Sequence, residues 1–299
     1  MSRVVGIFGP TASGKSAAAL ALARMTGGEI VSCDAMQAYR GLPILTNQPT
    51  AADLATVPHH LVGVWPLHHR GSVAEFGPLA RAAVDDVLAR GRTPIVAGGT
   101  GLYLRAILSD MRPPAQPAPG VRERYEQLYD RHGAKAAHGV LQTLDAPAAA
   151  AVHPNDRRRV VRALELHEAG QSLAGSELWQ PDVRLPTALF GLQLPAAEGA
   201  ARIAARTRAM FDAGVVEEVR AALGRGPLSE TAARIHGLQD VTALIGGEID
   251  REEAIRRLDS RTRRYAKRQR TWMRKLPGLR PIDASQRPAA MSAEIASLL

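Results

Sequence analysis

The first hundred residues alternate between short apolar runs and longer segments with helical spacing. Residues 4–8 form an apolar run that predicts a buried strand, and further short runs stand at 29–32 and 93–97. Residues 72–90 repeat apolar side chains at intervals of three and four, as an amphipathic helix does, and Gly91 follows as its expected end. Strands and helices in alternation predict an α/β fold, a parallel sheet with helices on both faces.

The pattern changes near residue 112. Proline recurs through residues 112–120 and predicts an extended linker, after which the sequence has helical patterns without strands. A strand pattern returns at 187–192, and further helical patterns follow it. We therefore expect two domains, a core of the P-loop NTPase type formed by 1–112 and 186–299, and a helical insertion at 113–185.

Two smaller expectations concern the ends of elements. The pair Asn155-Asp156 is expected to cap a helix over 157–169 that stops at Gly170, because asparagine and aspartate accept hydrogen bonds from the first helical turn and glycine commonly follows the last. The residues from Ala284 onward carry no strong pattern, and we expect them to be loosely ordered.

The run after the first predicted strand, residues 9–16, reads Gly-Pro-Thr-Ala-Ser-Gly-Lys-Ser. This is the phosphate-loop pattern, in which glycines let the backbone approach a phosphate and the N–H groups of the following helix point at it. Lys15 supplies a positive charge, and the hydroxyl of Ser16 can hold Mg²⁺. The candidate phosphate-binding residues are Gly9, Pro10, Thr11, Ala12, Ser13, Gly14, Lys15 and Ser16.

Two further polar residues directly follow predicted strands, Asp34 after the second and Thr100 after the third. Ligands in parallel sheets bind beyond the carboxyl ends of the strands, so both residues and the phosphate loop are expected to converge on one edge. Asp34 is open to three interpretations: a partner of Mg²⁺ or water, a general base, or the cap of a helix. Arg202 and Arg206 are four residues apart on a predicted helix and share a face, where one of them could clamp a diphosphate; the alternative is a solvated helix face.

Composition narrows the class of protein. With 45% hydrophobic residues the chain can bury a substantial core, and no apolar run approaches the length of a membrane span. The N-terminus lacks a signal-peptide pattern and the single cysteine, Cys33, excludes an internal disulfide framework, so we expect a cytoplasmic protein. Nothing in the sequence requires more than a monomer. The pairs His59-His60 and His68-His69 are interpreted as loop or strand-end residues rather than metal ligands.

The net charge of +9 favours a polyanionic partner. One basic cluster lies on the capped helix of the insertion, at 157–162. A second, residues 261–275, has basic side chains and no acid, with Tyr265 and Trp272 interleaved. Positive charge beside aromatic rings is typical of a surface that binds a phosphate backbone and stacks bases, so we expect a nucleic-acid partner.

Taken together, these residues resemble the tRNA dimethylallyltransferases, also called tRNA isopentenyltransferases. The resemblance spans roughly residues 4–275 and extends well beyond the phosphate loop, which many proteins share. The matching blocks are 9–16, 32–41, 58–61, 98–104, 153–165, 266–272, and Arg202-Ile203 with Arg206 and Met210.

The resemblance implies an enzyme that transfers a dimethylallyl group from dimethylallyl diphosphate to N6 of the adenine on the 3′ side of a tRNA anticodon. It implies that the phosphate loop binds the donor diphosphate, that Lys15 and Arg206 neutralise the leaving diphosphate, and that Ser16 helps to place Mg²⁺. Thr100 matches a threonine that hydrogen-bonds at the reaction centre, and Asp34 matches the general base on the adenine amine. The implied tRNA contacts are Asp34, Ala35, Met36, Gln37, Thr100, Arg122, Arg158, Arg159, Val160, Val161 and Arg162.

Three blocks depart from the family pattern. Ala35 stands where serine is usual, residues 45–49 read Leu-Thr-Asn-Gln-Pro in place of Gly-Thr-Ala-Lys-Pro, and residues 237–240 read Gly-Leu-Gln-Asp in place of a block like Gly-Tyr-Arg-Gln. The departures leave the residues implied in the chemistry in place, namely Lys15, Ser16, Asp34, Thr100 and Arg206.

Three other functions compete with this one. A small-molecule or nucleotide kinase would use Asp34 as a metal partner and turn over ATP. A prenyltransferase that acts on free adenine nucleotides would need neither the helical insertion nor the basic segment near the C-terminus. An RNA-binding module without catalysis would use the phosphate loop as a switch and would not depend on Asp34.

Overall fold

The computed structural model describes residues 3–111, 117–173 and 182–299. The chain divides into two compact units, here named the core unit, Met1–Asp110 with Pro181–Leu299, and the insertion unit, Met111–Gln180. The sequence analysis sets these boundaries at residues 112 and 185. Residues 112–116, at the start of the expected linker, lie outside the described residues.

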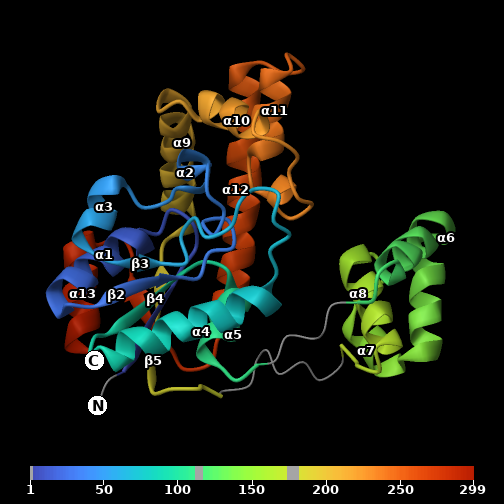
Figure 1. Ribbon diagram of the computed structural model, residues 1–299, viewed down its shortest axis with the longest axis horizontal. Helices are drawn as coiled ribbons and strands as arrows, with labels where there is room; N and C mark the ends of the chain where they lie inside the picture. The colour runs from blue at the N-terminus through green and yellow to red at the C-terminus, as the bar shows by residue number, and fades with distance from the viewer. Residues whose placement is uncertain (1–2, 112–116, 174–181) are drawn as a thin grey trace. The chain divides into compact units, whose positions relative to one another are not determined.

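A six-stranded sheet with the order β3-β2-β4-β1-β5-β6 forms the centre of the core unit (Figure 1). Its strands are β1 (Val4–Phe8), β2 (Glu29–Ser32), β3 (His59–His60), β4 (Pro94–Gly98), β5 (Thr187–Gln193) and β6 (Leu279–Asp283). Each neighbouring pair is parallel, and Val5 of β1 pairs with Ile95 on one side and Ala188 on the other. The predicted parallel sheet is confirmed, and β6 is a strand that the sequence pattern did not indicate.

Helices cover both faces of the sheet. One face packs on α1 and α13, and the other packs on α4 and α5. The helices of the core unit are α1 (Lys15–Thr26), α2 (Pro43–Thr46), α3 (Ala51–Thr56), α4 (Val73–Ala89), α5 (Gly101–Leu108), α9 (Ala196–Asp212), α10 (Val215–Leu223), α11 (Leu238–Ile245), α12 (Arg251–Met273) and α13 (Pro288–Ser297), with a 3₁₀ turn at Ala232–Arg234.

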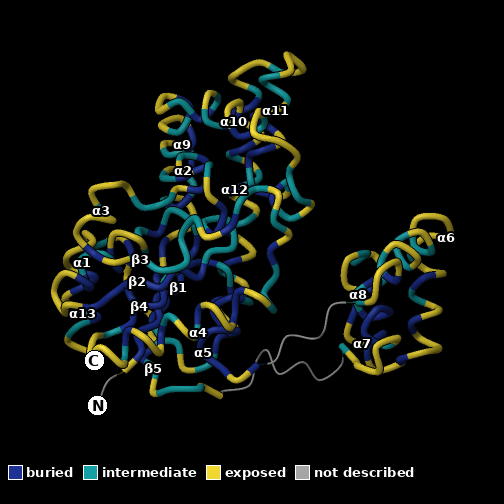
Figure 2. The backbone as a smooth tube through the Cα atoms, in the orientation of Figure 1, coloured by how far each residue is buried: buried dark blue, intermediate teal, exposed yellow. Residues whose placement is uncertain are grey.

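Strand β1 shows why the central runs are apolar at nearly every position. Successive side chains of a strand point to opposite faces of the sheet. Val5 and Ile7 are buried in the cluster that includes α1, whereas Val4 and Phe8 are buried in the cluster that includes α4. Both faces are therefore covered, and Figure 2 draws the central strands in the dark blue of buried residues.

The end of the chain is ordered. Helix α13 packs on α1, where Met291 and Ile295 are buried and the Oγ of Ser292 donates a hydrogen bond to the carbonyl of Ala18 (2.8 Å). The expectation of a loosely ordered end is therefore wrong. The hydrophobic pattern of this region is weak, because α13 has only two large apolar residues and β6 buries only Ile282.

The insertion unit has a helical core of its own. It contains α6 (Val121–Leu144), α7 (Ala146–Ala151) and α8 (Arg157–Glu168), which bury Leu141 and Leu164 among other residues. Helix α8 begins as predicted, since Oδ1 of Asp156 accepts the N–H of Arg159 (3.2 Å), and Gly170 follows its end with a φ of 70°. Of the helices in the described ranges, none combines the length and hydropathy that crossing a membrane requires.

A buried carboxylate ties β2 to its surroundings. The side chain of Glu29 is 1% exposed and pairs with the guanidinium of Arg90, whose Nη2 donates to Oε2 at 3.0 Å. The same oxygen lies 2.7 Å from Nε2 of His60 on β3. The hydrogen bond from Arg90, and then that from His60, hold the pKa of Glu29 below its usual value despite burial. His60 thus lies at the end of a strand, as predicted, and its partner is the carboxylate of Glu29.

We expect Glu29→Gln to destabilise the protein by about 2 kcal/mol, less than the loss for a fully buried pair because Arg90 is partly exposed. The carboxylate's contribution is present at pH 7 and is lost as the pH falls below the unfolded glutamate value of about 4.3 and through the lower folded pKa. Urea unfolding at pH 7 and at about pH 3 measures both effects, and the difference between variant and wild type is expected to shrink at the lower pH.

The control is Asp86→Asn, which removes an exposed partner of the same arginine. It is expected to change the free energy of unfolding by less than about 0.5 kcal/mol. Equal losses in the two variants would contradict the role assigned to the buried carboxylate.

Candidate active site

Three neighbouring strands end on the same edge of the sheet. β1 leads into the phosphate loop, β2 leads to Asp34 and β4 leads to Thr100, with β4 between the other two. The segments that follow them touch, since Oγ1 of Thr100 accepts the N–H of Ala35 (3.3 Å). The predicted convergence of the three segments is confirmed.

The phosphate loop has the geometry of an anion cradle. Ala12 and Gly14 have φ values of 65° and 84°, in the left-handed region that alanine adopts rarely and glycine readily. Lys15 is the first residue of α1, and its Nζ donates to the carbonyl of Pro10 at 3.5 Å. The positive end of the helix dipole and the Lys15 ammonium therefore meet at one point, which favours a bound anion.

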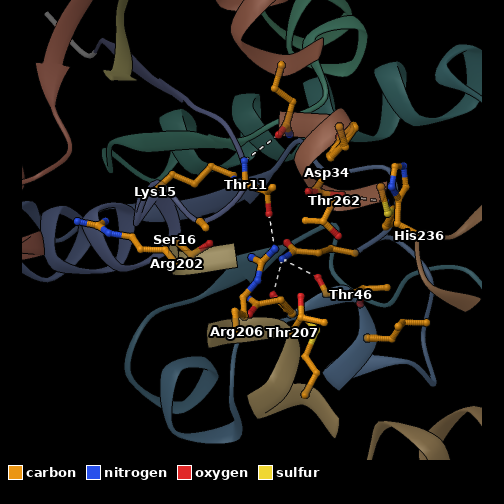
Figure 3. A pocket seen from close by; sticks show the side chains of 18 of the residues that line it. Thr11, Lys15, Ser16, Asp34, Thr46, Arg202, Arg206, Thr207, His236 and Thr262 are labelled. Carbon is orange, nitrogen blue, oxygen red and sulfur yellow. Dashed lines mark hydrogen bonds between the residues drawn. The ribbon is translucent and has the colours of Figure 1, made fainter. Parts of the chain in front are cut away.

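A cavity of about 380 Å³ opens beside the loop (Figure 3). The expected site residues that line it are Thr11, Ala12, Gly14, Lys15, Ser16, Asp34, Met36, Gln37 and Arg206. Those of the core unit that are not among its lining residues are Gly9, Pro10, Ser13, Ala35 and Thr100. The lining also includes Ala17, Leu45, Thr46, Asn47, Arg202, Thr207, Met210, His236, Leu258, Thr262, Tyr265 and Gln269.

Positive charge gathers at one side of the cavity. Figure 3 shows Lys15 and Arg202 there, and Arg206 reaches in from α9 to donate a hydrogen bond to Oγ1 of Thr11 (2.5 Å). Burial lowers the pKa of Lys15, as does the charge of Arg206, while Asp34 opposes this shift. Burial likewise lowers the pKa of Arg206, again against Asp34. Desolvated cations of this kind are stabilised by a bound anion.

The carboxylate of Asp34 lies on the other side of the cavity, near His236 (Figure 3). Its Oδ1 accepts the N–H of Met36 (3.0 Å), and within the described residues no hydrogen bond reaches its second oxygen. Asp34 thus caps a turn rather than a helix and still presents an oxygen to the cavity. The ring of His236 packs on that of Tyr265, with centroids 4.5 Å apart, and burial lowers the pKa of His236 to about 4, so the imidazole is neutral at pH 7.

Thr100 lies next to Tyr265. Besides holding the N–H of Ala35, its hydroxyl is 3.5 Å from the hydroxyl of Tyr265. In this structure Thr100 fixes the turn next to Asp34 and contacts Tyr265, which lines the cavity.

Helix α12 supplies a stripe that the sequence analysis missed. Leu258, Thr262, Tyr265 and Gln269 all line the cavity and follow one another at intervals of four, three and four. This is the spacing of one helix face. The basic residues that stand between these four side chains make the segment resemble a surface helix, so its apolar and polar stripe toward the cavity is hard to recognise in the sequence.

The segment 44–47 is held by a carboxylate from another helix. Glu218 of α10 accepts the N–H groups of Ile44 (2.7 Å) and Leu45 (2.9 Å). Burial raises the pKa of Glu218, while these two hydrogen bonds lower it. The segment that departs from the family pattern at 45–49 is therefore held in place at its start by Glu218.

The second basic cluster is less free than expected. Arg261 forms a two-bond pair with Asp240 (3.0 and 3.1 Å), and Arg263 pairs with Asp259 (2.7 Å). Acids from outside the run thus compensate part of its charge. Trp272 packs at the start of α5, where a Cβ on Gly101 would lie 2.2 Å from its ring. One face of this indole is used in packing, which corrects the expectation of a free stacking surface.

The insertion residues separate into two groups. The side chains of Arg158 and Arg159 are exposed, and Arg162 pairs with Glu165 (2.9 Å). The side chains of Val160 and Val161 are 0% and 1% exposed. The expected contacts of Val160 and Val161 with tRNA are therefore wrong for their side chains, which lie in the interior of the unit. Arg122, on α6, pairs with Glu126 (3.1 Å) and Glu165 (3.4 Å).

A parallel α/β sheet with a phosphate loop at the switch in strand order defines the fold of a P-loop-like protein. The comparisons narrow this class. The family model described as IPP transferase matches residues 37–276, and one described as isopentenyl transferase matches residues 2–62.

Individual relatives cover nearly the whole chain. A tRNA dimethylallyltransferase of Anaeromyxobacter dehalogenans (strain 2CP-C) is 44% identical over 98% of this chain and 99% of its own. One of Salinispora tropica is 43% identical over 94% of this chain and 88% of its own. The crystal structure of a full-length tRNA isopentenylpyrophosphate transferase from Bacillus halodurans matches with a TM-score of 0.73 at 32% identity, over 100% of this chain and 95% of that one.

The chain belongs to the tRNA dimethylallyltransferase family. It is therefore a prenyltransferase that modifies tRNA, and the kinase interpretation finds no support among these relatives.

We expect Arg206→Gln to weaken the binding of inorganic pyrophosphate by about 10–100-fold, because a hydrogen bond from a charged donor contributes roughly 1.5–3 kcal/mol. Isothermal titration calorimetry measures the affinity. The control is Arg208→Gln, which removes an exposed charge from the same helix. Equal losses in both variants would show that net charge, and not the position of Arg206, determines binding.

Proposed function

We propose that the protein transfers the dimethylallyl group of dimethylallyl diphosphate to N6 of the adenine on the 3′ side of a tRNA anticodon. The curated relatives carry the name tRNA dimethylallyltransferase, which supports this substrate pair. The observation that carries the proposal is that Asp34 lines the same cavity as Lys15 and Arg206. Such a cavity complements a diphosphate at one side and an exocyclic amine at the other.

The phosphate loop binds the leaving diphosphate. As the bond between the allylic carbon and the diphosphate oxygen breaks, the oxygen keeps the electron pair. Lys15 and Arg206 stabilise the charge that develops there, and their effect exceeds that in water because both are already desolvated. The apolar side chains of Leu45, Met210 and Leu258 line the same cavity and offer contacts to the hydrocarbon chain.

Asp34 accepts a proton from N6 as the new C–N bond forms. The lone pair of N6 is delocalised into the ring, so removal of a proton avoids a cationic nitrogen and assists a weak nucleophile. Oδ1 is held by the N–H of Met36, and this leaves the second oxygen for the amine. Thr100 keeps the N–H of Ala35 in place beside the base. The adenine has to leave its stack to reach the cavity.

The residues present fit a magnesium ion bound together with the diphosphate. Ser16, exposed at the start of α1, offers one hydroxyl oxygen, and the described ranges contain no cluster of three acidic, histidine or cysteine side chains that could cage a metal. Mg²⁺ typically takes few protein ligands and completes its shell with phosphate and water. Ser16 would hold the ion, which would supply positive charge against the diphosphate.

We propose that tRNA contacts come from both units. The core unit supplies Asp34, Ala35, Met36, Gln37 and Thr100, and the insertion unit supplies Arg122, Arg158, Arg159 and Arg162. The exposed Arg158 and Arg159 suit the phosphate backbone, whereas the side chains of Val160 and Val161 are buried. A tRNA substrate places the reaction in the cytoplasm, and a single copy of the chain carries each residue that the proposal uses, consistent with a monomer.

We expect Asp34→Asn to lower kcat by about 10²–10⁴-fold and to leave tRNA affinity within a few fold, since this is the usual contribution of a general base. The assay combines labelled dimethylallyl diphosphate with an unmodified tRNA transcript and identifies the labelled nucleoside. Wild-type protein is expected to label tRNA but not AMP, and Asp86→Asn, on an exposed face of α4, is expected to keep wild-type turnover.

The outcomes separate two ideas. Label on AMP instead of tRNA, or turnover of ATP without prenyl transfer, would contradict the proposed function. Labelled tRNA with near-normal turnover by Asp34→Asn would contradict only the assignment of the base.

We expect the double change Arg158→Ala with Arg162→Ala to weaken tRNA binding and to lower the slope of log affinity against log salt by about 1–2, as the loss of two phosphate contacts would. Filter binding over a series of salt concentrations measures the slope. A charge-matched control changes Arg24 and Arg280, two core-unit residues without a proposed tRNA contact. An unchanged slope in the first double variant would remove α8 from the interface.

A further inference from the structure

We propose that Gln269 is a positioning residue that holds the leaving-group side of the site at a fixed separation from the acceptor side. The inference rests on the proposed function for the meaning of these two sides. Gln269 comes from α12, in the middle of the basic segment, yet its side chain is buried, with 3% exposed. A neutral amide buried within such a segment requires partners for both its donor and its acceptor.

Both partners are backbone groups of the two glycine-rich loops. Oε1 of Gln269 accepts the N–H of Thr11 in the phosphate loop at 2.7 Å. Nε2 donates to the carbonyl of Gly99, after β4, at 2.9 Å. One amide thus bridges two loops that lie 88 residues apart in the sequence (99 − 11). Because one atom must accept and the other must donate, the orientation of the amide is fixed.

The first contact leads to the leaving group. Thr11, whose N–H is held by Gln269, uses its hydroxyl to accept the hydrogen bond from Arg206. Gln269 therefore fixes the residue against which Arg206 rests. The N–H of Thr11 is engaged by Gln269 and is therefore not among the loop N–H groups that remain for the diphosphate.

The second contact leads to the base. Gly99 precedes Thr100, whose Oγ1 holds the N–H of Ala35, and Ala35 adjoins Asp34. A continuous series of short contacts therefore runs from Arg206 through Thr11, Gln269 and the Gly99 loop to the turn of Asp34. A displacement of about 1 Å in such an arrangement can cost a hundredfold in rate.

The glycine at 99 fits this bridge. A Cβ at this position would lie 2.1 Å from Nε2 of Gln269 and 3.1 Å from the carbonyl oxygen of Gly9. No side chain can occupy that space while the amide is in place. The second glycine of the Gly-Gly-Thr-Gly block is therefore explained by the approach of Gln269 and the phosphate loop, and not by an unusual backbone angle.

Two variants separate the two contacts. Gln269→Met keeps the length of the side chain and removes both hydrogen bonds. Gln269→Glu keeps an acceptor for Thr11 and places a carboxylate oxygen against the carbonyl of Gly99. Ser109→Ala is the control for stability, because it removes a different buried hydrogen bond of the core unit (2.8 Å) away from the cavity.

The experiment combines hydrogen–deuterium exchange of the phosphate-loop peptide with steady-state kinetics on the full-length protein. For Gln269→Met we expect the Thr11 amide to exchange at least about tenfold faster and kcat to fall about 10–100-fold, with KM for tRNA within about threefold. For Gln269→Glu we expect the Thr11 amide to keep its protection while kcat still falls. For Ser109→Ala we expect a lower melting temperature with wild-type kcat.

Three results would overturn the proposal: unchanged exchange at Thr11 in Gln269→Met, a kcat of that variant within twofold of wild type, or an equal loss of kcat in Ser109→Ala. If wild-type protein does not transfer the prenyl group at all, the proposed function fails and the bridge is judged on exchange and on pyrophosphate affinity. Both would then have to change in Gln269→Met for the positioning role to stand.

Discussion

The site depends on how closely three strand ends can approach one another. A Cβ on Gly98 would lie 2.7 Å from the backbone of Cys33, and one on Gly101 would collide with the ring of Trp272. Packing therefore requires glycine at both positions. Because neither residue carries a side chain, β2, β4 and α12 can come together beside the phosphate loop. These backbone contacts set the separation of Asp34 from the phosphate loop, so the glycines contribute to the geometry of the site although they carry no functional group.

The arrangement of charge follows from the same geometry. The dipole of α1, the ammonium of Lys15 and the guanidinium of Arg206 converge on a space with few counter-ions, and burial makes each cation harder to keep charged. The diphosphate of the proposed donor would relieve this repulsion. Asp34 acts in the opposite sense, because its charge raises the pKa of both cations.

Local patterns predicted much of this. The phosphate loop, the strand before it and the capped helix α8 follow from residues close together in the sequence. The convergence of Asp34 and Thr100 follows from the general rule that the carboxyl ends of parallel strands meet at one edge of the sheet. The failures have a common cause, which is dependence on partners distant in sequence. The basic run at 261–275 is charged toward solvent and polar toward the cavity, and only the fold shows which side Gln269 faces. Val160 and Val161 matched a family contact by position, but the packing of the insertion decides that their side chains point inward.

Helix α13 has a consequence for biosynthesis. Its Met291 reaches the phosphate loop, where a Cβ on Gly14 would lie 3.3 Å from the methionine methyl group, and Ser292 is bonded to α1. Within the described ranges, the hydrophobic cluster of the insertion unit is formed by residues between 125 and 173. On the ribosome, the residues of this cluster are synthesised well before α13. The phosphate loop can therefore pack against Met291 only after α13 has left the exit tunnel, when the cluster of the insertion unit is already available to form.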